Sequence, residues 1–126
     1  MDQKVCLDTD VCIEILKNTE KGKELLKAIE KSNVCLSTIT VFELFLRKTN
    51  LFPIEMLIHK TTILDFDELT ARKASDIFKS LQGSGKSMDL RDLFIASTAV
   101  MHNCALATLN EKHFVQITDL KLVQVS

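Results

Sequence analysis

The stretch Val5-Cys6-Leu7-Asp8-Thr9-Asp10 turns from an uninterrupted apolar run to two acids that flank a threonine. A short run that is apolar at every position is typical of a parallel strand whose two faces are both covered. Thr9 is a favourable N-cap residue, and apolar residues at helical spacing follow it. The stretch therefore predicts a buried strand, a helix after it, and Asp8 at the junction between them.

The same alternation of short apolar runs and amphipathic segments continues along the chain. Further strands are predicted at residues 34–36, 62–64, 104–109 and 120–125. Helices are predicted at residues 21–31, 40–49, 67–81 and 90–101, with a shorter one that starts near Pro53. We therefore expect one α/β domain over residues 1–126, with a central parallel sheet of four to five strands flanked by helices on both faces.

The composition excludes several classes of protein. Of the 126 residues, 46% are hydrophobic and 26% are charged, with one proline and three glycines, which excludes a disordered or collagen-like chain. No apolar run approaches the roughly 18 residues of a membrane span, and the N-terminus does not resemble a signal peptide. We expect a cytoplasmic protein with no membrane association, whose four cysteines are buried and reduced.

The charge balance restricts how the protein can bind nucleic acid. Sixteen basic and 17 acidic residues give a net charge of −1. A protein that bound nucleic acid mainly through its overall charge would be more basic. Any such binding must therefore be local or assisted by a metal ion. Lys86 and Arg91 are the candidates for a local phosphate contact, with a solvated surface role as the alternative.

Three acids stand where predicted strands end or predicted helices begin. Asp8 ends the first strand, Glu43 opens the helix after the second strand, and Asp92 lies in the first turn of helix 90–101. In an open parallel sheet these positions share one edge, where ligands bind. Clustered carboxylates repel one another, and a hard divalent cation with oxygen ligands relieves that repulsion. The three acids are therefore candidate metal ligands.

Each of these acids also has a purely structural interpretation. Thr40 and Glu43 have the spacing of a capping box that opens a helix. Asp92 can complement the positive end of a helix dipole, and Asp8 can be a turn residue at a strand end. Asp89 lies one helical turn before Asp92, so it can either cap that helix or add a carboxylate to the site.

Four segments resemble, in the same order, the signature of the PIN-domain family, and especially of its short VapC-type toxin ribonucleases. They are Leu7–Asp10, Thr40–Leu44, Asp89–Ala96 and Thr108–Phe114. The resemblance covers essentially the whole chain and implies a single PIN-like domain. It also implies a nuclease that depends on Mg²⁺ or Mn²⁺ and cleaves single-stranded RNA. Such a nuclease is the toxin of a toxin–antitoxin pair, restrained by a cognate antitoxin and often a homodimer.

The resemblance also assigns roles by position. It makes Asp8 and Asp92 the principal metal ligands and Glu43 the third acid. The metal would lower the pKa of a bound water and neutralise charge on the phosphoryl oxygens. The family's fourth acidic position is best matched by Asn110, whose carbonyl oxygen carries no charge, and we include it among the catalytic candidates.

The identity of the fourth ligand stays open at this point. Many relatives have an acid one residue before the phenylalanine of the last motif, where this chain has His113. Asn110, His113 or Asp89 can take the place of the fourth acid. The number of metal ions, one or two, is open for the same reason.

Three rival interpretations were weighed against a nuclease. A PIN-like scaffold that has lost catalysis and acts as a binding protein is suggested by the missing fourth acid. A haloacid-dehalogenase-type phosphatase is suggested by Asp8 and Asp10, but Cys12 stands where that family has Thr or Val. A phosphate-binding loop at residues 83–87 lacks its first glycine, because Ser80 stands there, and it follows a helix instead of a strand.

The predicted helix at residues 40–49 and the segment after it have more large apolar residues than one buried side of a helix can hold. The residues concerned are Phe42, Phe45, Leu46, Leu51 and Phe52. We expect some of them to be exposed in the monomer and covered by a second subunit or an antitoxin helix.

Overall fold

The computed structural model describes residues 3–123, which form four strands and seven helices. In chain order the elements are β1 (Lys4–Leu7), α1 (Thr9–Lys17), α2 (Glu20–Ile29), β2 (Asn33–Ser37), α3 (Thr38–Phe45), α4 (Phe52–His59), β3 (Thr62–Leu64), α5 (Glu68–Gly83), α6 (Leu90–Met101), β4 (Ala105–Ala107) and α7 (Glu111–Phe114). The predicted order of strands and helices is confirmed, with boundaries that shift by a few residues.

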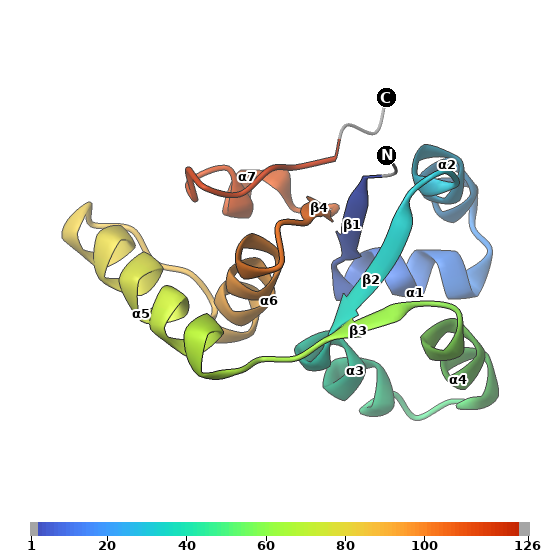
Figure 1. Cartoon of the computed structure of the whole chain (residues 1–126). Coiled ribbons are helices and arrows are strands. Elements are labelled where there is room, and N and C mark those ends of the chain that lie inside the picture. The colour runs from blue at the N-terminus through green and yellow to red at the C-terminus, as the bar shows by residue number, and fades with distance from the viewer. Residues whose placement is uncertain (1–2, 124–126) are drawn as a thin grey trace.

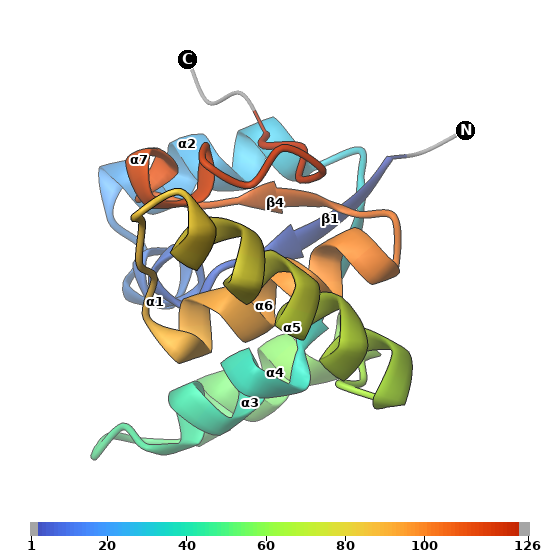
Figure 2. The ribbon, with the colours of Figure 1, turned by 90° about the vertical axis from the view of Figure 1, so that its left-hand side faces the viewer.

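The four strands form one parallel sheet in the order β3-β2-β1-β4. The sheet separates α5, α6 and α7 from α1, α2 and α4 (Figure 1). Turning the molecule shows α5 packed over α6 on one side of the sheet (Figure 2). The expected α/β domain with helices on both faces is therefore confirmed.

Alternate residues of the central strands supply two hydrophobic cores. Val5 and Leu7 face a cluster with α1, α2, α3 and α4, whereas Cys6 faces a cluster with α5, α6 and α7. Because successive side chains of a strand point to opposite faces, one apolar run can serve both cores. This arrangement explains why the run is apolar at every position.

The predicted fifth strand is reduced in the structure. Only one parallel bridge, between Leu106 and Leu122, remains of the strand predicted at residues 120–125. The last two positions of that prediction lie outside the described residues. The strand predicted at residues 104–109 shortens to β4.

Two predicted helix starts are wrong. Asp8 is the N-cap of α1, because its side chain accepts a hydrogen bond from the backbone of Thr9, and Thr9 is already helical. Ser37 caps α3 and accepts from the backbone N–H of Thr40 at 3.1 Å, so the predicted capping box is not formed. The helix starts at Thr38 and ends at Phe45, well before residue 49. The side chain of Glu43 is therefore available for other contacts.

The predicted position of Pro53 is confirmed, because it lies in the first turn of α4. Asn103 has the left-handed backbone conformation that closes α6, with φ of 55°. All four cysteines are buried free thiols. Among residues 3–123, no helix combines the length and the apolar character needed to cross a membrane.

An apolar patch remains exposed on α3 and the start of α4, as expected. Its members and their exposed fractions are Phe42 (54%), Phe45 (38%), Leu46 (56%), Leu51 (39%) and Phe52 (66%). Groups of large apolar side chains on a surface mark sites of interaction with another molecule. We call these five residues the α3–α4 patch.

Helices α1 and α2 meet at Gly22. A Cβ atom at this position would overlap the backbone carbonyl of Glu14 and lie 3.1 Å from the Cα of Ile15. Thr19 caps α2 at the same place, since its hydroxyl accepts from the Gly22 N–H at 3.0 Å. The two helices therefore form a close pair that only glycine permits.

We predict that Gly22→Ala destabilises the fold by about 1–3 kcal/mol, because the backbones of α1 and α2 must separate to admit the methyl group. Thermal unfolding followed by circular dichroism measures the effect. Gly83→Ala is the matched control, since nothing lies within 4 Å of a Cβ at that helix end. Equal unfolding temperatures for the two variants would contradict the prediction.

Candidate metal-binding and catalytic site

The carboxyl ends of β1, β2 and β4 carry polar residues at one edge of the sheet. Asp8 follows β1, Ser37 ends β2 and Thr108 follows β4. The backbone N–H of Asp8 donates to the carbonyl oxygen of Ala107 at 2.9 Å, which ties the ends of β1 and β4 together. The first turns of α1, α3 and α6 reach the same edge, as expected for an open parallel sheet.

Asp8 is a buried carboxylate with two hydrogen-bond donors. Only 4% of the residue is exposed. Its Oδ1 accepts from the backbone N–H of Thr9 at 2.8 Å, and its Oδ2 accepts from the hydroxyl of Thr108 at 2.8 Å. These bonds fix the position of both oxygens.

Burial, and to a smaller extent the carboxylates of Asp92 and Asp10, raise the pKa of Asp8 to about 6. The hydrogen bonds from Thr108 and Thr9 oppose this rise because they stabilise the charged form. The folded protein therefore holds a carboxylate whose charge is only partly compensated by its own residues.

Glu43 is held from two sides. Its Oε1 accepts a hydrogen bond from the Thr9 hydroxyl at 2.6 Å, and its Oε2 lies 3.4 Å from Nη1 of Arg91. The Thr9 oxygen also lies 3.2 Å from the hydroxyl of Thr40. These contacts connect α1, α3 and α6 around one carboxylate.

Asp92 lies in the first turn of α6 and is half-buried. Burial is the main reason that the pKa of its carboxyl group is raised, and the negative charges of Asp89 and Glu43 raise it less. His113 lowers the pKa. Asp89 is the N-cap of α6 and accepts from the backbone N–H of Arg91 at 2.9 Å. The capping role that the sequence left open for Asp89 is thus occupied.

The structure brings Asp8, Glu43 and Asp92 to the same edge, and their charges act on one another. They do not form a closed ligand group: within residues 3–123, no three His, Cys, Asp or Glu side chains are grouped closely enough to hold a metal ion. Internal donors hold two of the carboxylates, Asp8 and Glu43, in their present positions. The chemistry of the donor set, three carboxylates with hard oxygen atoms, nevertheless fits a hard divalent cation.

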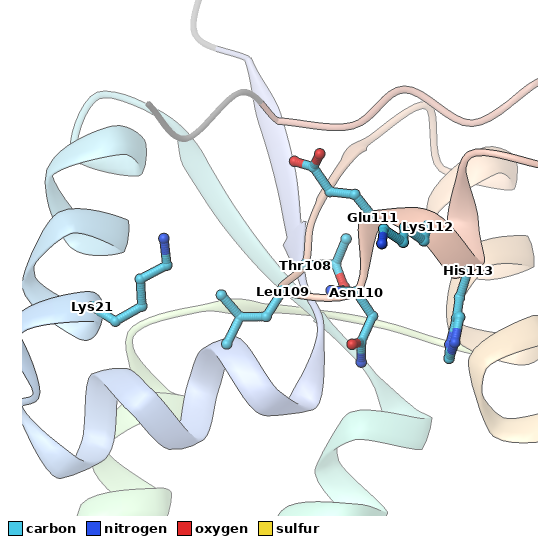
Figure 3. Close-up of a pocket in the computed structure, with 7 residues that line it drawn as sticks. All are labelled: Lys21, Thr108, Leu109, Asn110, Glu111, Lys112 and His113. Atoms are coloured by element: carbon cyan, nitrogen blue, oxygen red, sulfur yellow. The ribbon is translucent and has the colours of Figure 1, made fainter.

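Asn110 lies beside this edge and lines a cavity of about 490 Å³. Its backbone N–H donates to the Thr108 hydroxyl at 3.0 Å, the same hydroxyl that donates to Asp8. The side chains of Asn110 and His113 extend to the same side of their segment, whereas Glu111 extends to the other (Figure 3). Lys21 and Lys112 also line the cavity, so two basic residues form part of its wall.

His113 connects this cavity to the carboxylates. It also lines a second cavity of about 270 Å³, together with Asp89 and Asp92. The structure therefore places Asn110, His113 and Asp89, the three candidates for the fourth ligand, around the same edge. No described hydrogen bond distinguishes one of them as that ligand.

Two residues of the site were missed from the sequence. The sequence patterns include Thr108, which holds Asp8, only as the start of a motif, and they give no role to Ser37, the cap of α3. A common signal was available for both, because each hydroxyl residue stands directly at the end of an apolar strand, as Asp8 does.

The chain is similar to known proteins over most of its length. The family model of the PIN domain matches residues 5–120. Ribonuclease VapC3 of Methanocaldococcus jannaschii is 39% identical over 92 residues, which cover 72% of this chain and 93% of that protein. The tRNA(fMet)-specific endonuclease VapC of Shigella flexneri is 26% identical over 125 residues, 94% of this chain and 95% of that protein.

A solved structure gives the same result for the fold. The DNA-bound VapBC of Salmonella typhimurium superimposes on this chain with a TM-score of 0.80 at 26% identity. The match covers 95% of this chain and 96% of that chain.

We predict that Asp8→Asn stabilises the metal-free protein near pH 7.5 by about 1–2 kcal/mol. Because the pKa of Asp8 is raised to about 6 in the folded state, the folded protein binds more protons than the unfolded chain between about pH 4 and 6. Stability contributed at this position therefore falls as the pH rises through that window. The gain in the free energy of unfolding from Asp8→Asn is therefore largest above this pH range and becomes smaller as the pH falls.

Urea unfolding in EDTA at pH 7.5 and pH 5 measures the difference. Asp67→Asn is the control, because hydrogen bonds from Thr70 lower the pKa of Asp67, so its removal gives no such gain. A gain for Asp8→Asn that is unchanged or larger at pH 5 would contradict the sign of this linkage.

Proposed function

This chain belongs to the PIN domain family, among the VapC ribonucleases, and on that premise we propose that it is a toxin endoribonuclease that cleaves single-stranded RNA with the aid of Mg²⁺ or Mn²⁺. The observation that carries the proposal is the placement of Asp8, Glu43 and Asp92 at one edge of the sheet, in a chain related to VapC proteins over its whole length.

We propose that Asp8, Asp92 and Glu43 hold the metal ion, with Asn110 or Asp89 as a further oxygen ligand. A bound divalent cation supplies an activated water and neutralises the charge that grows on the phosphoryl oxygens. The chain's own part is to position these ligands. Thr108 and the Thr9 backbone orient both oxygens of Asp8, while the Thr9 hydroxyl orients Glu43.

The cavity beside Asn110 suits the RNA strand. Lys21, Lys112 and His113 line it together with one acid, Glu111, so basic groups outnumber acidic ones next to a site that is otherwise acidic (Figure 3). Ammonium groups attract phosphates over a distance that salt screens. A chain with a net charge of −1 can therefore bind RNA locally at this edge.

The alternatives receive less support. A catalytically inactive scaffold would not need to keep Asp8, Glu43 and Asp92 at one edge, and the relatives are named as ribonucleases. The phosphatase interpretation is not favoured, because the family model of the PIN domain matches residues 5–120. The segment at residues 83–87 follows α5, so it lacks the strand that a phosphate-binding loop requires.

We propose that a cognate antitoxin and a second copy of this chain are its protein partners. A solved structure with the same fold is a VapBC complex, and the α3–α4 patch offers an exposed apolar surface. We also propose that the protein acts in the cytoplasm, since its substrate is RNA and its four cysteines are free thiols.

We predict that Asp8→Asn lowers cleavage of single-stranded RNA by roughly 100-fold or more, because the substitution removes the charge that holds the cation. Asn110→Ala should have a smaller effect, since an amide oxygen is a weaker ligand than a carboxylate for a hard cation. Cleavage rates with Mn²⁺ and with EDTA measure both effects.

Asp76→Asn, an exposed acid of α5, is the matched control, and circular dichroism reports whether each variant is folded. Undiminished cleavage by a folded Asp8→Asn protein that is insensitive to EDTA would contradict the metal-dependent mechanism. A wild-type protein that cleaves no RNA with any divalent cation would favour the inactive scaffold.

We predict a dimeric mass for the isolated chain at tens of micromolar, because a second copy can cover the α3–α4 patch. Light scattering after size-exclusion chromatography measures the mass. Phe42→Ser with Phe52→Ser should shift the mass toward the monomer, whereas Leu69→Ser, an exposed apolar residue on α5, should not. A monomeric wild type would contradict self-association and leave the antitoxin as the partner that covers the patch.

A further inference from the structure

The guanidinium group of Arg91 lies beside the acids of the site. Arg91 precedes Asp92 in the first turn of α6, and its Nη1 atom lies 3.4 Å from Oε2 of Glu43. The Arg91 side chain is 52% exposed, whereas that of Glu43 is only 20% exposed. The guanidinium group therefore lies at the mouth of the site and reaches inward to a more buried carboxylate.

This ion pair differs from the others that residues 3–123 form. Three of those pairs join residues three or four apart in one helix, and the fourth joins Lys73 to Asp119 away from the site. The pair of Arg91 and Glu43 instead joins α6 to α3. Arg91 therefore forms an ion pair with a carboxylate of the site, Glu43.

The other contacts of the carboxylates add no charge. Asp8 accepts from a backbone N–H and from the hydroxyl of Thr108, and Glu43 accepts from the hydroxyl of Thr9. Neutral donors orient a carboxylate but leave its charge in place. Without a metal ion, Arg91 relieves the repulsion at Glu43 and His113 relieves it in part at Asp92, whereas Asp8 has neutral donors.

We propose that Arg91 is a built-in counter-ion of Glu43, that a divalent cation displaces it, and that the released guanidinium then binds a phosphate of the RNA. This inference rests on the proposed function. The carboxylate of Glu43 interacts less strongly with Arg91 when it also binds a metal ion, so metal binding and the ion pair compete. Removing the competitor should therefore tighten metal binding.

The geometry favours displacement of Arg91. A pair at 3.4 Å whose cation is half-exposed is weak, because water screens it and the long side chain loses little by leaving. A divalent cation carries twice the charge and contacts several carboxylates at once. Glu43 meanwhile keeps its orientation through the bond from Thr9, so it does not depend on Arg91 for its position.

The released side chain is suited to RNA. The planar guanidinium group binds phosphate oxygens through paired N–H donors, and its charge persists at every relevant pH. The Arg91 side chain reaches Glu43, so a phosphate attracted to a cation held by these carboxylates would lie within its reach. The same residue would then compensate acids before metal binding and phosphate afterwards.

Titration calorimetry with Mn²⁺, without RNA, tests the competition. We expect Arg91→Gln to raise the affinity for Mn²⁺ by about three- to fivefold, the range that a weak ion pair allows. Arg72→Gln is the matched control, because it breaks a pair with Glu68 within α5 and should leave the affinity unchanged. Asp92→Asn provides the reference for a weakened site.

A double-substitution cycle separates the direct pair from a long-range effect of charge. In a Glu43→Gln background, Arg91→Gln should no longer change the affinity for Mn²⁺. An equal gain in both backgrounds would overturn the inference, as would unchanged or weaker binding by Arg91→Gln alone. A wild type that binds no Mn²⁺ at all would instead overturn the proposed function.

Cleavage kinetics at saturating Mn²⁺ test the second half of the proposal. We expect Arg91→Gln to raise KM for single-stranded RNA severalfold while kcat changes little, and Arg91→Lys to recover part of the loss. A KM equal to that of the wild type would overturn the phosphate contact. Because the wild type is measured alongside, loss of this effect is distinguishable from a protein without ribonuclease activity.

Discussion

The buried carboxylate of Asp8 is the group around which the site is built. Its backbone N–H is bonded to the end of β4, its Oδ1 to the start of α1, and its Oδ2 to Thr108. One residue thus terminates the central strand, caps the next helix and presents an acid at the edge of the sheet. The parallel order β3-β2-β1-β4 puts β1 between its neighbours, so this acid lies where the other polar segments also end.

Hydroxyl groups hold the acids without neutralising them. Thr9, Ser37, Thr40 and Thr108 are all buried, and they connect α1, β2, α3 and the end of β4 through hydrogen bonds. A hydroxyl can donate to a carboxylate and accept from a neighbour, so a chain of them fixes geometry in little space. Charge compensation is left to Arg91 at Glu43, to His113 at Asp92 and to any cation that binds. Burial, and to a smaller extent the repulsion among the acids, therefore raises the pKa values of Asp8 and Asp92.

The order of elements and the placement of the acids were predictable from the sequence. Short runs that are apolar at every position identified the strands, and parallel topology then required Asp8, Glu43 and Asp92 to share an edge. The start of α3 was not predictable, because both Ser37 and Thr40 are good N-caps and packing decides between them. The partner of Glu43 was not predictable either, since Arg91 approaches from a helix that is distant in sequence. The last predicted strand failed for another reason: only Leu122 bridges to the sheet within the described residues.

The reactivity of the four buried thiols depends on local unfolding of the protein. Burial raises the pKa values of Cys6 and Cys12, and that of Cys104 to about 11, so few thiolates exist in the closed fold. Because the thiolate is the reactive form, alkylating reagents meet an inert protein until a segment opens. Cys6 lies in β1 two residues before Asp8, and Cys12 lies in α1 four residues after it. The rate of modification of these two cysteines therefore measures how often β1 and α1, on either side of Asp8, unfold locally.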